Sequence, residues 1–286
     1  MYKILYYTGW VLSLLPLQLM YGFSAIFSFV IYHLGLYRKN VVFTNLRNSF
    51  PEKAEKEIHS MAKGFYRHFT DQMMESFRVM HISPERILKH MHYENPEVLE
   101  KFHRKGQSVI LLTAHYGNWE WMVSLPLITR HRVLVVYKPP NNKGSHFVYT
   151  QFGARYGGLS TALQNYPRVM LEHRARKEST ATFLLIDQRP DKRKGLYWNT
   201  FLNQDTAWEN GVEKLARKTN QAVVFIQLEM QKRGKYCIRF HTLCEEAGQT
   251  DPDEITEAYS RILEKSIRSR PEIWLWTHKR WKRARV

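Results

Sequence analysis

Ser108-Val-Ile-Leu-Leu-Thr-Ala-His115-Tyr-Gly117-Asn118-Trp-Glu120-Trp121 is the stretch of sequence that decides the fold. Its run of Val, Ile and Leu has no polar alternation, which is typical of a strand buried on both faces. The strand ends at His115, Gly117 and Asn118 supply a turn, and a helix is expected to begin near Trp119. A strand end that turns into a helix is where open α/β sheets place their functional sites.

Three more short apolar runs follow this strand and predict the rest of the sheet. They occupy residues 133–137, 181–186 and 222–228, and the segments between them are long enough for crossover helices. We therefore expect an α/β fold with a mainly parallel central sheet flanked by helices. Two of these helices are indicated at residues 51–81, where apolar side chains recur every three or four positions, and at residues 253–270.

The N-terminal segment, residues 1–37, is expected to associate with a membrane. No Asp, Glu, Lys or Arg occurs between Lys3 and Arg38, and about 20 apolar residues suffice to span a bilayer. Polar residues dilute the run, so the sequence leaves open a full span, a helix lying in one leaflet, or a buried pair of helices. Arg38 and Lys39 follow the run, and the positive-inside rule then places the rest of the chain, residues 38–286, in the cytoplasm.

Charge and composition restrict the partners. The chain has 43 Lys and Arg against 26 Asp and Glu, a net charge of +17, which favours anionic partners such as acidic proteins or membrane surfaces. Nucleic acid is not expected, because the sequence has no Cys/His finger, no zipper and no RNA-recognition motif. Neither a phosphate-binding Gly-rich loop nor clustered metal ligands occur, so no cofactor and no metal are expected.

His115 and Glu120 are the candidates for chemistry. Residues five apart point to different sides of a continuous helix, so these two side chains can meet only across the Gly117-Asn118 turn. The carboxylate would then accept a hydrogen bond from one imidazole nitrogen and leave the other free to take a proton from a hydroxyl. The alternative, a histidine that only caps the end of a strand, remains open from the residues alone.

The segment His115-Tyr-Gly-Asn-Trp-Glu120 resembles the H-x4-D/E block of glycerolipid acyltransferases, in the glutamate version of the late acyltransferases of lipid A biosynthesis. Five other segments resemble that family in the same order along the chain: Arg38 to Pro51 with its N-L-x-x-x-F-P ending, Tyr137-Lys-Pro139, Arg155-Tyr-Gly157, Leu185-Ile-Asp187-Gln188 and Pro271 to Lys282. The resemblance covers nearly the whole chain. Six ordered matches are far more specific than one.

The resemblance implies an O-acyltransferase of lipid A and lipopolysaccharide biosynthesis at the inner membrane, with its catalytic domain facing the cytoplasm. The donor would be acyl-acyl carrier protein and the acceptor a hydroxyl of a lipid A precursor, with direct transfer and no covalent enzyme intermediate. In this reading His115 is the general base and Glu120 its partner.

Further roles follow from the same resemblance. Arg155 would stabilise the oxyanion or bind an acceptor phosphate, unless it is only a surface arginine. The backbone amides of Gly117 and Asn118 are alternative oxyanion donors. Asp187 would support the site or cap a strand. Three C-terminal tryptophans are expected to serve in packing or at the membrane interface rather than in chemistry: Trp274, Trp276 and Trp281.

The chain also departs from the family pattern. Thr206-Ala-Trp208-Glu209-Asn-Gly211 stands where the family has small residues and Pro-Thr before a glycine, which leaves the acyl chain length open. Lys138 replaces an arginine and weakens any bidentate phosphate contact there. Two rival functions remain: acyl transfer to a lysophospholipid or amino-acid lipid, and a non-catalytic basic membrane-binding protein.

Overall fold

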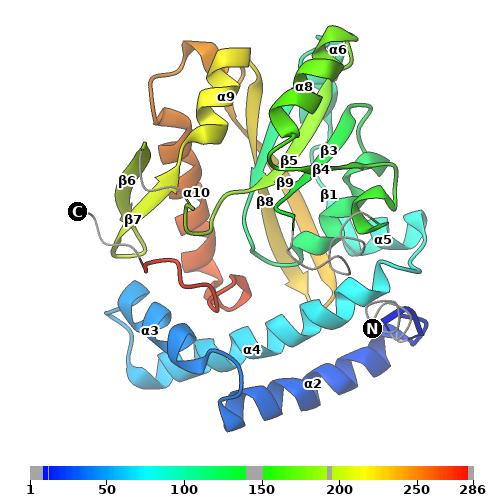
Figure 1. Ribbon diagram of the computed structural model, residues 1–286. Helices are drawn as coiled ribbons and strands as arrows, with labels where there is room; N and C mark the ends of the chain where they lie inside the picture. Colours follow the sequence, from blue (N-terminus) through cyan, green and yellow to red (C-terminus); the bar gives the residue numbers. More distant parts are fainter. Residues whose placement is uncertain (1–8, 12, 140–150, 192–194, 283–286) are drawn as a thin grey trace.

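The computed structural model describes residues 9–11, 13–139, 151–191 and 195–282 and shows a central sheet of seven strands (Figure 1). Their order across the sheet is β1-β9-β8-β2-β5-β3-β4, and all neighbours are parallel except β8 and β9. The strands are β1 (Met91–Tyr93), β2 (Val109–Thr113), β3 (Arg132–Tyr137), β4 (Leu159–Ala162), β5 (Thr180–Leu185), β8 (Ala222–Lys232) and β9 (Lys235–Cys244). The expected fold class, a mainly parallel α/β sheet, is confirmed.

All four strands expected from apolar runs are present as β2, β3, β5 and β8. β2 lies between β5 and β8, and each of its residues is buried. The sequence did not indicate β1, β4 or β9, nor the separate antiparallel hairpin of β6 (Leu196–Phe201) and β7 (Gln204–Glu209).

Helices cover both faces of the sheet (Figure 1). Successive residues of β2 alternate between two hydrophobic cores, with Ile110 and Leu112 in one and Val109 and Leu111 in the other. The helical elements are α2 (Leu17–Leu34), α3 (Lys39–Ser49), α4 (Glu55–Arg78), α5 (Pro84–His90), α6 (Glu97–Arg104), η1 (Trp119–Leu127), α8 (Tyr166–Ala175), α9 (Gly211–Thr219), η2 (Ala247–Gln249), α10 (Glu254–Ser269) and η3 (Pro271–Ile273). The two helices expected at residues 51–81 and 253–270 are α4 and α10.

The helix expected to begin near Trp119 is η1, which has the tighter 3-10 winding and contains Pro126. Proline lacks an amide hydrogen and cannot continue an α-helical ladder, which accounts for an irregular helix here. The Asn118 side chain caps η1 by accepting a hydrogen bond from the Trp121 amide at 3.1 Å.

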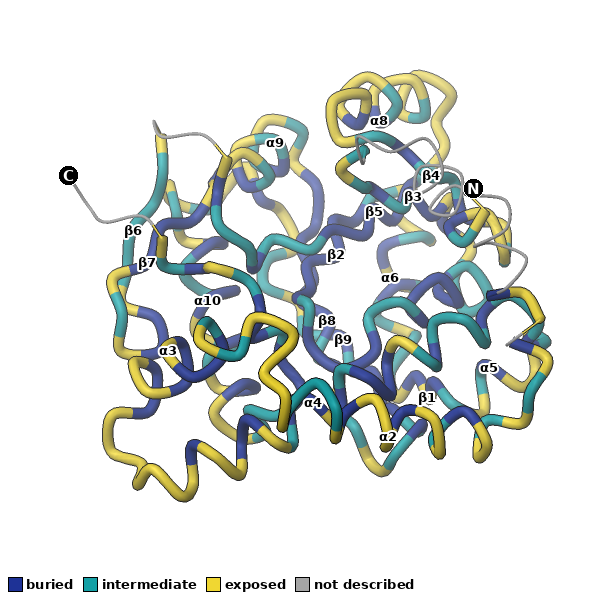
Figure 2. Tube along the Cα trace, turned by 60° about the horizontal axis from the view of Figure 1, so that its bottom comes forward, coloured by how far each residue is buried: buried dark blue, intermediate teal, exposed yellow. Residues whose placement is uncertain are grey.

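Helix α2 lies antiparallel to α4 beneath the sheet (Figure 1). Tyr21 donates to Glu75, and Ser24 donates to Asp71, both at 2.5 Å. Only Met20, Ser24 and Ser28 of α2 are buried, and Figure 2 shows exposed residues along its length. The described part of the expected membrane segment therefore contains a helix long and apolar enough to cross a membrane, attached along one side to α4. Residues 1–8 and 12 lie outside the described part.

Candidate active site

His115 and Asp187 lie at the same level of the sheet, at the carboxyl ends of two neighbouring parallel strands. Thr113, the last residue of β2, pairs with Leu185, the last residue of β5. His115 follows Thr113 by two positions, and Asp187 follows Leu185 by two positions. The register of the two strands therefore brings the two side chains together beyond the carboxyl ends of the strands. Ligands of open α/β sheets bind outside these ends.

Asp187 contacts His115 through both carboxylate oxygens. Its Oδ1 lies 2.7 Å from His115 Nδ1, and its Oδ2 accepts the His115 backbone amide at 3.0 Å. Trp274 donates its indole N–H to the same Oδ2 at 2.9 Å. The Asp187 side chain is 2 % exposed and that of His115 is 20 % exposed, so the carboxylate is enclosed while the imidazole is accessible.

Asp187 is a charged partner for the imidazole at neutral pH. Burial alone would raise the pKa of Asp187, but the neighbouring His115 and the hydrogen bonds from His115 and Trp274 lower it below its usual value. A carboxylate at Nδ1 fixes the tautomer of a histidine, because Nδ1 then carries the proton and Nε2 the lone pair. This is the arrangement that a general base requires.

The Nε2 atom of His115 lies 3.2 Å from the side-chain nitrogen of Gln188. With Nδ1 bound to Asp187, this contact is an amide N–H donated to the Nε2 lone pair. A substrate hydroxyl that approaches Nε2 therefore has to displace the Gln188 amide. The indole of Trp119 lies edge-on to the imidazole at a centroid distance of 5.0 Å.

Glu120 lies near His115 without the hydrogen bond that the sequence led us to expect. Nδ1 is already bound to Asp187, so Glu120 interacts with the imidazole only through its charge. Burial raises the pKa of Glu120, and the charge of His115 opposes that shift. The structure thus provides two carboxyl groups around His115, of which Asp187 is the hydrogen-bond partner.

The turn between His115 and Glu120 is tightly held. Gly117 adopts φ +63°, and a Cβ atom there would lie 2.0 Å from Leu228 Cδ2, so only glycine fits. Its amide donates to the Ile273 carbonyl at 2.8 Å, which occupies one of the predicted oxyanion donors. The Leu275 amide donates to the His115 carbonyl at 3.0 Å, so the C-terminal segment holds the first part of the turn through two backbone hydrogen bonds.

Glu75, in the last turn of α4, fixes the second turn residue. It accepts hydrogen bonds from Asn118 Nδ2 at 2.6 Å, from Tyr236 at 2.8 Å and from Tyr21 of α2 at 2.5 Å. The residue has no exposed surface, and burial raises the pKa of Glu75 to about 7, against the lowering effect of these three donors. Helix α2, helix α4 and the turn at Asn118 are therefore connected through one buried carboxyl group.

Arg155 is not in contact with the histidine. Its guanidinium donates to the backbone carbonyls of Val79 at 3.1 Å and Ile82 at 3.4 Å, just after α4. Its side chain also lies over the ring of Tyr156. Within the described residues these contacts attach the segment that precedes β4 to the end of α4.

The C-terminal segment contributes residues whose roles the sequence did not reveal. His278 Nε2 accepts the Arg189 amide at 3.1 Å, and burial lowers the pKa of His278 to about 4. Arg280 is 2 % exposed, donates to the Ala207 carbonyl at 2.6 Å and lies over Trp208 at 4.6 Å. Burial lowers the pKa of Arg280 to about 10, while the charge of Asp187 opposes the shift. The buried guanidinium is therefore close enough for its charge to interact with the Asp187 carboxylate.

The tryptophans and the divergent segment are packed in or against the core, and Trp274 also donates the hydrogen bond to Asp187 described above. Trp274 and Trp276 are buried, and their rings meet at right angles with centroids 4.7 Å apart. Trp281 donates to Thr206 at 2.7 Å, and Trp208 lies in the core behind the sheet edge. Lys138, which replaces the family's arginine, pairs with Asp191 at 2.5 Å.

No metal site is found in residues 9–11, 13–139, 151–191 and 195–282. These ranges contain no group of three or more His, Cys, Asp or Glu side chains that could hold an ion.

Comparison with known proteins identifies the family of the chain. The sequence profile of the family described as "Bacterial lipid A biosynthesis acyltransferase" matches residues 3–283. The chain is 22 % identical over 245 residues to a lipid A biosynthesis palmitoleoyltransferase of Escherichia coli (strain K12), covering 86 % of this chain and 79 % of that protein. A lipid A biosynthesis acyltransferase of Shigella flexneri matches to the same extent. The chain thus belongs to the family of bacterial lipid A biosynthesis acyltransferases.

Proposed function

We propose that this protein transfers a fatty acyl chain from acyl-acyl carrier protein to a hydroxyl of a lipid A precursor. The observation that carries the proposal is the His115–Asp187 pair, an accessible imidazole held at Nδ1 by an enclosed carboxylate at the sheet edge. Membership of the family supports acyl transfer as the reaction. The geometry of the pair supports His115 as the base that this reaction needs.

The reaction is direct transfer in two steps. His115 Nε2 removes the proton of the acceptor hydroxyl, whose oxygen attacks the thioester carbonyl to give a tetrahedral intermediate. The intermediate then expels the donor thiolate, which takes the proton back from the imidazolium. Asp187 stabilises that imidazolium, because a carboxylate at Nδ1 favours the charged ring. Glu120 adds a second carboxyl group near the same charge.

The oxyanion needs a donor that is not otherwise engaged. Among the candidates, the Gly117 amide is bound to Ile273, and the Arg155 guanidinium is bound to Val79 and Ile82. The Asn118 side chain is fixed by Glu75, which leaves its backbone amide at the start of η1. We assign the oxyanion to this amide. Because Asn118 has no exposed surface, the turn has to shift when substrate binds, and Arg155 joins only if its own segment also moves.

We propose that α2 lies in the plane of the membrane surface rather than across it, and that it carries residues 38–286 on the cytoplasmic face of the inner membrane. A crossing α2 would draw its antiparallel neighbour α4 into hydrocarbon, and α4 bears charged side chains throughout its 24 residues. The outer face of α2 exposes Leu19, Phe23, Ile26, Phe27 and Phe29. At about 2 kcal/mol for each, their burial in a leaflet supplies on the order of 10 kcal/mol.

The positive net charge of the chain supports acyl carrier protein as the carrier of the donated acyl group. Acyl carrier protein is acidic, and a chain of net charge +17 attracts it. Two basic stretches, residues 189–194 and 279–285, are the candidate contact surface; residues 192–194 and 283–286 lie outside the described part. His278 and Arg280 connect the second stretch to the catalytic carboxylate.

The test is reconstitution of the reaction. Purified protein is incubated with acyl-acyl carrier protein and a lipid A precursor, and product mass is read by mass spectrometry. We expect the precursor to gain one acyl chain. A lysophospholipid and an amino-acid lipid are offered in the same reaction. If one of them is acylated while the lipid A precursor is unchanged, that lipid and not the precursor is the acceptor.

A further inference from the structure

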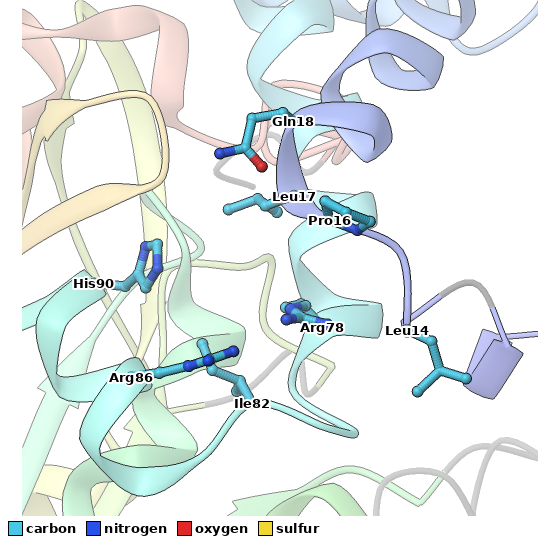
Figure 3. Close-up of a pocket in the computed structure, with 8 residues that line it drawn as sticks. All are labelled: Leu14, Pro16, Leu17, Gln18, Arg78, Ile82, Arg86 and His90. Atoms are coloured by element: carbon cyan, nitrogen blue, oxygen red, sulfur yellow. The ribbon is translucent and has the colours of Figure 1, made fainter.

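A cavity of about 390 Å³ lies between the start of α2, the end of α4 and α5 (Figure 3). Arg78 comes from the last turn of α4, and Arg86 and His90 come from α5. Figure 3 shows these three side chains gathered around one space, with Leu17 of α2 facing them. None of the residues that line this cavity forms a recorded contact with His115 or Asp187, so it is separate from the catalytic pair.

The polar wall of the cavity is cationic and lacks counter-charges. Arg78 donates one N–H to the Ser13 carbonyl at 2.5 Å, and Arg86 has no side-chain hydrogen bond among the described residues. In the same part of the chain neither guanidinium forms an ion pair with a carboxylate. Two guanidinium groups beside one cavity, each with free N–H groups, match the oxygen atoms of a phosphate.

The opposite wall is apolar and is formed by the residues just before α2 and by the start of α2, the helix proposed above to lie at the membrane surface. Leu14, Pro16 and Leu17 form it, and Leu14 is 52 % exposed. Apolar side chains continue from there along the outer face of α2. A ligand that satisfies both walls carries a phosphate on one end and hydrocarbon on the other, which describes a membrane lipid and not a free phosphate.

We propose that this cavity binds the phosphate group of an anionic glycerophospholipid, whose acyl chains run along α2. The bound lipid fixes the start of α2 to the end of α4 and sets the depth at which the protein sits in the leaflet. The proposal goes beyond acyl transfer. It rests on the cavity and on the proposed placement of α2 at the membrane surface, and it stands or falls independently of the proposed reaction.

The experiment measures binding of short-chain phosphatidic acid, below its micelle concentration, to the full chain in neutral detergent by calorimetry. No vesicle is present, so the measured binding does not include a general attraction of the basic protein to a charged membrane surface. Arg86→Gln is expected to weaken binding about tenfold, because it removes a charge-assisted contact. Lys89→Gln, on the same short helix but outside the cavity lining, is the matched control and is expected to change binding by less than about twofold.

A second probe identifies the source of the phosphate. Glycerol phosphate carries the same group without acyl chains and is expected to bind far more weakly than phosphatidic acid. Equal binding of the two probes would overturn the lipid assignment, and equal losses in Arg86→Gln and Lys89→Gln would overturn the site. Acyl transfer by Arg86→Gln, measured in the same detergent, is expected to match that of the unchanged protein, because Arg86 is not in the catalytic machinery.

Discussion

The Nδ1 atom of His115 and the Oδ1 atom of Asp187 lie 2.7 Å apart, although 72 positions separate the two residues in the chain. The parallel register of β2 and β5 creates this pair, and Trp274 and the His115 amide hold the carboxylate in place. The imidazole of His115 is therefore oriented by Asp187, which follows the neighbouring strand β5. It is not oriented by Glu120 of η1, the helix that follows His115 in the chain.

Asp187→Asn tests this orientation. The amide of asparagine can donate to Nδ1 and so move the imidazole proton to Nε2, where it blocks base catalysis. We expect kcat to fall on the order of 10⁴-fold with a much smaller change in KM. Steady-state kinetics with acyl-acyl carrier protein measure both, and a variant with nearly full kcat would remove Asp187 from the mechanism.

Glu120→Gln separates the two carboxyl groups. Glu120 acts on the imidazole only through its charge, and burial raises its pKa, so we expect kcat to fall less than in Asp187→Asn. Parallel kinetics of the two variants give the comparison. If Glu120→Gln were the more severe change, Glu120 and not Asp187 would orient the histidine in the reacting state.

Gly117→Ala tests the tight turn. The new Cβ meets Leu228 at 2.0 Å and the backbone keeps φ +63°, so we expect both lower thermal stability and loss of activity. Gly106→Ala is the matched control, since Gly106 has φ +62° with no atom within 4 Å of a Cβ. The control is expected to show only the backbone penalty, about 1 kcal/mol, with activity retained. Equal stability losses would show that Leu228 is not the obstacle.

Glu75 predicts a pH dependence of stability. Its pKa is raised from 4.5 to about 7 in the folded protein, chiefly by burial, so the folded state holds this proton more tightly than the unfolded state. The resulting contribution is complete below pH 4.5 and is lost as the pH rises through 7, a loss on the order of 3 kcal/mol. Glu75→Gln cannot titrate, so its stability is expected to change less over this range.

Thermal unfolding between pH 5 and pH 8 measures this difference. Glu55→Gln is the control: the hydrogen bond from Arg47 lowers the pKa of Glu55, so no stability is lost from that group as the pH rises. Parallel curves for Glu75→Gln and the unchanged protein would mean that Glu75 does not titrate in this window.

Much of the sheet could be predicted, for a physical reason. Strands β2, β3, β5 and β8 are buried on both faces and so need continuous apolar residues, which local sequence displays. β9 mixes polar and apolar residues because it is only partly buried, and β4 has four residues at the sheet edge, so neither left a distinct pattern. In α4 the expected core stripe includes buried Ile58 and Phe65, whereas Met73 is 45 % exposed.

Only those parts of the site that lie close together in the sequence could be predicted. His115 and the turn at Gly117 follow from contiguous residues, but the partner of the imidazole depends on which strand lies beside β2. Strand order is a property of the whole sheet, so the sequence favoured the nearby Glu120 over the distant Asp187 as the hydrogen-bond partner. The Glu75 carboxyl was missed for a similar reason, since its three donors come from α2, the catalytic turn and β9.

The most direct test of the account is acyl transfer by His115→Ala. The protein is purified beside the unchanged chain, its folding is verified by thermal unfolding, and both are incubated with acyl-acyl carrier protein and a lipid A precursor. We expect product formation to fall by several orders of magnitude, on the order of 10³-fold or more, at unchanged thermal stability. Undiminished product from a folded His115→Ala protein would contradict the central claim that this imidazole is the base.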